Sequence, residues 1–325
     1  MRKSKIEISE KTTLDLIDLP LQEAGVKDFF GIWLIRDSVS DFTAIVDVGP
    51  ASTVSLLIDE LTELGVNRID HILLSHIHLD HSGGLAQVLR AFPSSMVTVH
   101  PKGRRHLTDP EKLWESSLQV IPDMAAAYGK PLPVDEKFFL DESEAIPGIK
   151  VLETPGHAPH HLSFLYDDGE ERVLFAGEAA STYNNLDDLI PGSGKGKYLL
   201  RPASPPRFYL ESALESIEKL RRQKATTLCY AHFGYTREVD RMLGEAKEQI
   251  LLWQNIFLEY LSEHPGTEPG EDLGTLVSFV IDKDPWLSEF SRLPEETGKR
   301  EMGFLLSSAA GFLGAVYPQP ATGVK

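Results

Sequence analysis

The stretch with the clearest chemistry is a run of histidines with one aspartate. It reads Ser75-His76-Ile77-His78-Leu79-Asp80-His81-Ser82-Gly83-Gly84, so three imidazoles and a carboxylate fall within six positions. Neutral imidazole and carboxylate are ligands of zinc, iron and manganese, and gathering them in one turn is costly without a cation. The alternative is a polar turn whose histidines have unrelated structural roles. A structural role explains a single histidine better than it explains a cluster. The pattern therefore predicts a metal site on this turn.

The order of this and later motifs resembles a known family. His-x-His-x-Asp-His after an apolar strand, followed by Gly-Gly and a helix, resembles the signature of the metallo-β-lactamase superfamily. The strand end at 47–49 precedes it, and the turns at 154–164, 175–178 and 231–234 resemble the later ligand motifs. The resemblance covers about residues 12 to 235. It is specific for the fold and the metal site, and it gives little information about the substrate.

The resemblance implies two divalent ions, zinc in the first place, with iron or manganese as alternatives. The implied ligands are His76, His78 and His157 for the first ion, and Asp80, His81 and His232 for the second. Family members usually have a bridging aspartate after the Ala-Gly pair, whereas this chain has Glu178, which is one methylene longer. We expect Glu178 to be a metal ligand that bridges the two ions or binds only one.

Other candidate residues have weaker support. Tyr183 is a candidate substrate contact, because related hydrolases often have an aromatic hydroxyl near this place. The alternative is an aromatic that packs against the C-terminal helices. The Gly-rich stretch 191–197 reads as a loop, and its flanking Lys195, Lys197 and Arg201 suit an anionic substrate or a solvated tip. The expected structural residues are His161 as a hydrogen-bonding support, His71 at a strand end, His100, His106 and His264 on the surface, and Cys229 in a buried strand.

Alternating strands and helices must position these turns. Strand-like apolar runs occupy 14–17, 29–35 and 43–48, and Ile69–Leu74 reads as a buried strand just before the histidine cluster. Helical spacing follows at 52–64 and 84–91, and strands recur at 149–153, 162–166, 173–176 and 227–230. This alternation predicts an α/β layered domain. The resemblance implies the four-layer αββα metallo-β-lactamase sandwich.

The chain changes character after Tyr235. Apolar residues from Val239 to Tyr260 fall on one helical face, and a last helix is predicted over Glu295–Val316. We therefore expect a catalytic domain at 1–235 and a helical C-terminal appendage at 236–325. The apolar faces of these helices are expected to pack on the main domain, on a second copy of the chain in a homodimer, or on both.

Composition excludes several classes of partner. The chain has 325 residues with a formal net charge of −17. This charge disfavours binding to nucleic acids and anionic membranes, because both are negatively charged and are bound through Lys and Arg. The single cysteine permits no intrachain disulfide. The first 13 residues lack the apolar run of a signal peptide, and no apolar run approaches the length that spans a bilayer. We expect a cytoplasmic protein that acts on a small molecule.

The predicted function is that of a metal-dependent hydrolase. A metal-activated hydroxide would attack an ester, thioester or lactone-type substrate, and Asp80 would be the catalytic residue that orients the nucleophile or accepts its proton. Two alternatives remain open. One is an oxidoreductase with a single iron that oxidises thiols or persulfides, and the other is a non-catalytic metal-binding effector.

Overall fold

The chain folds into two compact units in a computed structural model that describes residues 2–21, 26–141, 144–186, 190, 197–232, 234–265 and 272–317. Unit 1 comprises Met1–Glu153, His160–Gly177 and Lys224–Arg237. Unit 2 comprises Thr154–Pro159, Glu178–Gln223 and Glu238–Lys325. The domain boundary that we predicted after residue 235 stays a prediction.

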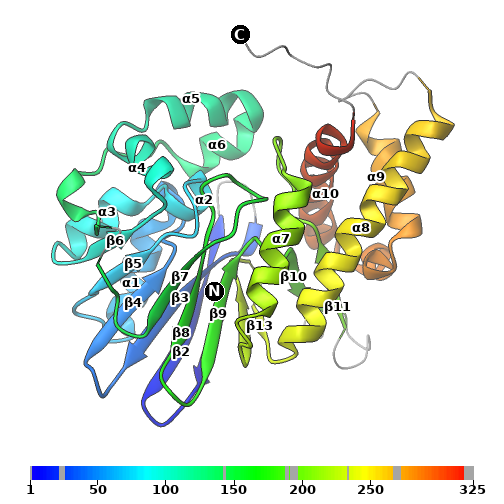
Figure 1. The fold of residues 1–325 in the computed structure, drawn as a ribbon. Helices are drawn as coiled ribbons and strands as arrows, with labels where there is room; N and C mark the ends of the chain where they lie inside the picture. Colours follow the sequence, from blue (N-terminus) through cyan, green and yellow to red (C-terminus); the bar gives the residue numbers. More distant parts are fainter. Residues whose placement is uncertain are drawn as a thin grey trace. The chain divides into compact units, whose positions relative to one another are not determined.

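The first sheet of unit 1 has six strands in sequence order (Figure 1). They are β1 (Arg2–Glu7), β2 (Thr12–Leu21), β3 (Val26–Asp37), β4 (Phe42–Val46), β5 (His71–Leu73) and β6 (Met96–Thr98). Neighbours are antiparallel up to β4, and β4, β5 and β6 are parallel. Because the parallel strands run the same way, β4 and β5 both end at the edge of the sheet where the histidine turn begins.

The second sheet of unit 1 has the order β13-β12-β9-β8-β7. Its strands are β7 (Ile149–Glu153), β8 (Leu162–Asp167), β9 (Arg172–Gly177), β12 (Thr227–Tyr230) and β13 (Tyr235–Thr236). The β9 and β12 strands pair in parallel. The two strands therefore end side by side, just before Glu178 and His232.

An apolar core joins the two sheets. Trp33 on β3 and Phe175 on β9 are each 1% exposed, and their ring centroids are 6.1 Å apart. The Trp33 indole also donates from Nε1 to the carbonyl oxygen of Tyr230 at 2.8 Å, so the sheets are linked by a polar bond as well. Along β3 the alternate residues Ile32 and Leu34 are equally buried, which means that the other face of the first sheet is also covered.

Helices cover that other face (Figure 1). Helix α1 (Val54–Glu63) buries Leu57 and Leu61, and α3 (Leu85–Ala91) buries Val88 and Leu89. The other helices of unit 1 are α2 (Leu79–Ser82), α4 (Pro101–Thr108), α5 (Glu111–Val120) and α6 (Pro122–Tyr128), with 3-10 turns η2 (Ala51–Thr53) and η3 (Glu136–Phe138). Unit 1 alone therefore supplies one helical and two β layers of the predicted sandwich.

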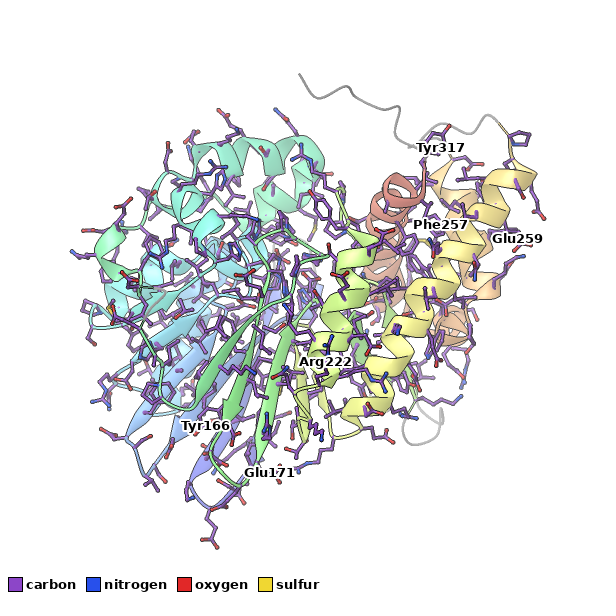
Figure 2. All side chains as sticks on the ribbon, in the orientation of Figure 1. Tyr166, Glu171, Arg222, Phe257, Glu259 and Tyr317 are labelled. Carbon is purple, nitrogen blue, oxygen red and sulfur yellow. The ribbon has the colours of Figure 1, made fainter. Side chains whose placement is uncertain are left out.

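Unit 2 contains a hairpin and helices packed on one another. Its elements are β10 (Thr182–Asn185), β11 (Tyr198–Arg201), α7 (Leu210–Arg221), α8 (Val239–Glu263), α9 (Leu273–Lys283), η4 (Pro285–Leu287), η5 (Phe290–Arg292) and α10 (Glu295–Val316). On α8, Phe257 is buried against Phe312 of α10 at 5.0 Å between ring centroids. Glu259 of the same helix is exposed and accepts from Lys283 of α9 at 2.7 Å (Figure 2 labels Phe257 and Glu259). The helical C-terminal region is confirmed, and α10 has the predicted bounds. A second copy of the chain against these helices stays a prediction.

Two details differ from the sequence predictions or limit them. His100 was expected on the surface, but it is 7% exposed and caps α4, because its Nδ1 accepts from the backbone N–H of Lys102 at 3.1 Å. Lys195 and most of the 191–197 loop lie outside the described residues. Among the helices of the described part, none is both long and apolar enough to cross a membrane.

Candidate metal centre

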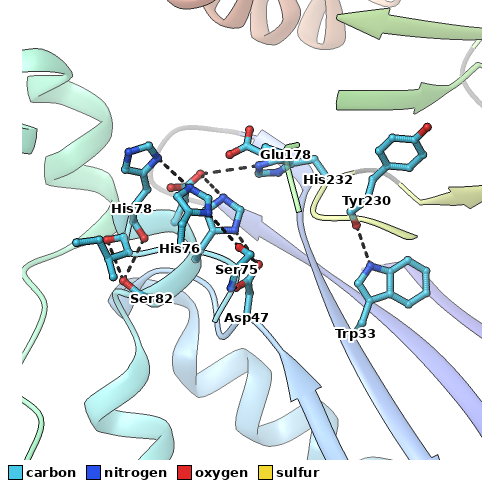
Figure 3. A network of polar contacts seen from close by, with 12 residues as sticks. Trp33, Asp47, Ser75, His76, His78, Ser82, Glu178, Tyr230 and His232 are labelled. Atoms are coloured by element: carbon cyan, nitrogen blue, oxygen red, sulfur yellow. Dashed lines mark hydrogen bonds and ion pairs between the residues drawn. The ribbon is translucent and has the colours of Figure 1, made fainter. Parts of the chain in front are cut away.

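The histidine turn is anchored by an aspartate at the end of the neighbouring strand. Asp47 follows β4, has a left-handed backbone with φ 61° and is 2% exposed. Its carboxylate accepts from the backbone N–H and the hydroxyl of Ser75, both at 2.8 Å, and lies 3.0 Å from His81 Nδ1 (Figure 3). One buried carboxylate therefore holds both the start of the turn and a predicted ligand. The sequence motif flagged this strand end but did not reveal its role.

The first two histidines face each other through ring nitrogens. His76 Nε2 lies 2.9 Å from His78 Nδ1, and His76 Nδ1 lies 3.0 Å from Ser75 Oγ. His78 is also the N-cap residue of α2, so the helix start fixes its backbone. Two imidazole nitrogens at this separation suit a shared proton or a shared cation.

Asp80, His81 and His232 form a group inside unit 1 that could hold a metal ion. Asp80 Oδ2 lies 3.3 Å from His81 Nε2 and 3.9 Å from His232 Nε2. Ligands bound tetrahedrally at about 2.1 Å are about 3.4 Å apart, so these separations fit a zinc-sized ion. His232 Nδ1 lies 2.7 Å from the carbonyl oxygen of Phe29, to which it donates. This bond leaves Nε2 as the acceptor that a metal requires.

The charge in this group also favours a cation. Burial lowers the pKa of His81, but the carboxylates of Asp80 and Asp47 outweigh it and hold that pKa well above its ordinary value. A bound metal ion takes the place of such a proton, because metal and proton compete for the same nitrogen. The donor set of unit 1 therefore fits a divalent cation.

Unit 2 contributes a second pair of predicted ligands. His157 Nε2 lies 3.0 Å from Glu178 Oε2, and Glu178 is labelled in Figure 3. His157 Nδ1 lies 3.0 Å from the carbonyl oxygen of Ala203. The residue before His157 must be glycine, because Gly156 has φ 148° and a Cβ there would lie 2.6 Å from Ala213 Cα. The Pro-Gly-His turn is thus fixed by contact with α7.

The glycine before Glu178 is required as well. Gly177 has φ 58°, and a Cβ would lie 2.5 Å from His161 Nε2. His161 is fully buried and its ring centroid lies 5.3 Å from that of His76. Among the described residues His161 belongs to neither ligand group, in keeping with a supporting role.

The sequence model of the Metallo-beta-lactamase superfamily matches residues 32–232. The chain belongs to this superfamily. It is 28% identical over 224 residues to the metallo-beta-lactamase fold-containing protein ST1585 of Sulfurisphaera tokodaii, covering 66% of this chain and 76% of that protein. The crystal structure of ST1585 from Sulfolobus tokodaii superposes with a TM-score of 0.53 at 22% identity, over 89% of this chain and 98% of the other. The predicted α/β metallo-β-lactamase fold is thereby confirmed.

Two further superfamily relatives are named as hydrolases. A hydroxyacylglutathione hydrolase of Nitrobacter hamburgensis is 30% identical over 151 residues, covering 46% of this chain and 48% of that protein. An N-acyl homoserine lactonase of Bacillus thuringiensis is 26% identical over 181 residues, covering 55% of this chain and 61% of that protein. This superfamily member is thus hydrolase-like, with a cluster of His, Glu and Asp side chains suited to metal ions.

The remaining candidates are not members of either ligand group. Tyr183 is on β10, and its ring stacks on Tyr198 at 5.5 Å between centroids. Its substrate contact stays a prediction. Lys197 pairs with Glu289 at 3.1 Å, and Arg201 is buried rather than solvated. Cys229 is fully buried, which raises the pKa of its thiol and fits the predicted structural role.

Proposed function

We propose that this superfamily member is a metal-dependent hydrolase of small esters, thioesters or lactones. The observation that carries the proposal is the shared orientation of four imidazoles. In His76, His81, His157 and His232, Nδ1 is engaged by a hydroxyl, carboxylate or carbonyl oxygen, and Nε2 faces another predicted ligand. The exposed His264 also turns its Nδ1 to a carbonyl oxygen, that of Tyr260, but it belongs to neither ligand group.

We infer two ions, with zinc as the first candidate. Asp80, His81 and His232 form one ligand set, and the family resemblance assigns His76, His78 and His157, with Glu178, to the other ion. Support comes from the family match, which runs through all these positions, and from the separations of 2.9 and 3.0 Å within the two pairs. Zinc suits sites that are rich in imidazole.

The residues of the site divide the chemical work. Bound ions of this kind make water nucleophilic near neutral pH and polarise a carbonyl oxygen. Asp80 holds the ligand geometry through His81 and His232, and its side chain is 17% exposed, so it can accept a proton from an attacking water. No serine or cysteine nucleophile is needed, in agreement with the burial of Cys229.

A metal analysis combined with a substrate panel tests the proposal. The purified protein is analysed for metal content and then assayed on thioester, lactone, aryl ester and phosphodiester substrates, with and without chelator. We expect turnover of at least one carbonyl substrate that chelator abolishes and added zinc restores. Asp80→Asn should lose at least about 100-fold in rate, whereas the exposed control Asp123→Asn should keep full activity. Turnover that survives complete metal removal would refute the proposal.

A further inference from the structure

The imidazole of His232 is held on an edge of the first sheet. Strand β4 pairs only with Trp33–Asp37 of β3, so the part of β3 before Trp33 extends beyond its neighbour. There the backbone N–H of Gly31 donates to the carbonyl oxygen of Ala231 at 2.9 Å. The carbonyl oxygen of Phe29 accepts from His232 Nδ1 at 2.7 Å. Alternate residues of a strand direct these groups to the same edge, so residues 231–232 take the place of β4 there.

Two aromatic rings lie against the His232 imidazole. The ring centroid of Phe29 lies 5.5 Å from that of the imidazole, and the centroid of Phe30 lies 6.4 Å from it. The two phenyl rings also contact each other edge to face, with 4.3 Å between their centroids, and both side chains are buried. Packed rings restrict rotation of the imidazole, while the hydrogen bond to Phe29 fixes which nitrogen faces the backbone. Together they direct His232 Nε2 toward Asp80.

Tyr128 supports these rings from the helical layer of unit 1. It is the last residue of α6 and is 4% exposed. Its ring stacks on Phe29 at 6.5 Å between centroids and meets Phe30 edge to face at 5.8 Å. Helices α5 and α6 are described over their whole length, and Ala125 and Tyr128 are their only buried residues. Tyr128 is therefore the one large side chain that this helix pair buries.

We propose that Tyr128 is a positioning residue for the second metal ion. It holds Phe29 and Phe30 against His232, and the imidazole then keeps Nε2 directed at the ion before the ion binds. A ligand that is already held in place loses less freedom on binding, so the ring of Tyr128 raises the affinity of this site. The inference rests on the proposed function, because His232 is a ligand of that ion there.

The alternative role of Tyr128 is packing alone. Loss of its ring would then destabilise the protein and leave the affinity of both metal sites unchanged. Tyr166 offers a matched control, since it is 2% exposed in the same unit and its hydroxyl donates to Asp37 at 3.2 Å. Asp37 is the last residue of β3, at the end of the strand opposite to Phe29. The same substitution at Tyr166 therefore removes a buried ring far along the strand from His232.

Zinc affinities of ring variants test the proposal. The purified full chain is equilibrated with zinc against a series of chelators, as wild type, Tyr128→Phe, Tyr128→Leu and Tyr166→Leu. We expect Tyr128→Phe to keep both affinities, because the ring remains. Tyr128→Leu should lose about 10-fold in affinity for one ion and keep the affinity for the other, as at the low end of the range for outer partners of a metal-binding histidine. Tyr166→Leu should keep both affinities and lose stability in denaturant unfolding.

A second measurement reports on His232 directly. Nuclear magnetic resonance of protein labelled with nitrogen-15 in histidine detects the Nδ1 proton that His232 donates to Phe29. After metal removal by chelator, we expect this proton to be protected from exchange with water in the wild type and in Tyr128→Phe, and to lose this protection in Tyr128→Leu. If Tyr128→Leu does not fold, Phe30→Leu removes a ring that contacts both Tyr128 and His232, and it should show the same selective loss.

Each outcome decides between the two roles. Wild-type zinc affinities in Tyr128→Leu, an equal loss at both ions, or the same loss in Tyr166→Leu would overturn the positioning role and leave the hydrolase proposal standing. Failure of the wild type to bind zinc would overturn the proposed function. Exchange of the His232 proton in the metal-free protein would then still decide whether Tyr128 positions the imidazole.

Discussion

Asp47→Asn should weaken the second metal site by changing the proton position on His81. In the native structure the Asp47 carboxylate accepts from two Ser75 donors and from His81 Nδ1. Asparagine has one oxygen and one NH₂ group. If its oxygen accepts from the Ser75 backbone N–H, its NH₂ group faces His81 Nδ1. That nitrogen must then become an acceptor, and the proton moves to Nε2, the atom predicted to bind metal.

The magnitude follows from this loss of the correct tautomer. Removing an outer hydrogen-bond partner of a metal-binding histidine typically costs 10- to 100-fold in metal affinity. This corresponds to about 1.4–2.7 kcal/mol. We also expect the free energy of unfolding to fall by about 1–3 kcal/mol, because a buried hydrogen-bonded carboxylate is replaced.

Equilibration against a series of chelators, followed by elemental analysis, measures the affinity of each site. The control is Asp15→Asn, since Asp15 is 5% exposed in the same sheet and pairs with Arg36, away from the ligands. Asp15→Asn should lose stability but keep metal affinity. Metal affinity in Asp47→Asn equal to that of the wild type would refute the tautomer argument.

Three further predictions concern backbone, ligand and pH. Gly156→Ala should cost at least about 2 kcal/mol in denaturant unfolding, since the new Cβ meets Ala213; an unchanged midpoint would contradict the close packing. Glu178→Asp should keep similar or higher activity if Glu178 bridges, while Glu178→Ala should bind less metal, and an unchanged metal count would show that Glu178 is not a ligand. Burial raises the pKa of Asp168, but hydrogen bonds from Ser9, Glu171 and Glu170 outweigh this effect and lower the pKa to about 2. Its stabilisation is therefore present above pH 3.8 and lost as pH falls through 2, and Asp168→Asn should lose less stability over that range in acid titrations.

The sequence by itself determined the identity of the predicted ligands and most elements. His76, His78, Asp80 and His81 stand in one turn, where no folding is needed to recognise a cluster of donors. Long periodic segments were also readable, as the bounds of α10 show, because an amphipathic period of many residues outweighs local exceptions. The polar hairpin of β10 and β11 was missed, since Thr182–Asn185 has no apolar alternation and pairs with residues 198–201 further along the chain.

Only the tertiary structure decided how those donors are oriented and charged. The carbonyl oxygens that orient His232 and His157 belong to Phe29 and Ala203, and every residue has such an oxygen, so side-chain identity cannot encode the contact. The role of Asp47 depends on two parallel strands ending together. The burial of His100 depends on its position at the start of α4. Arg201 reads as a loop cation in the sequence, because its burial depends on Glu301 and Ser308, which lie about a hundred residues away in the chain.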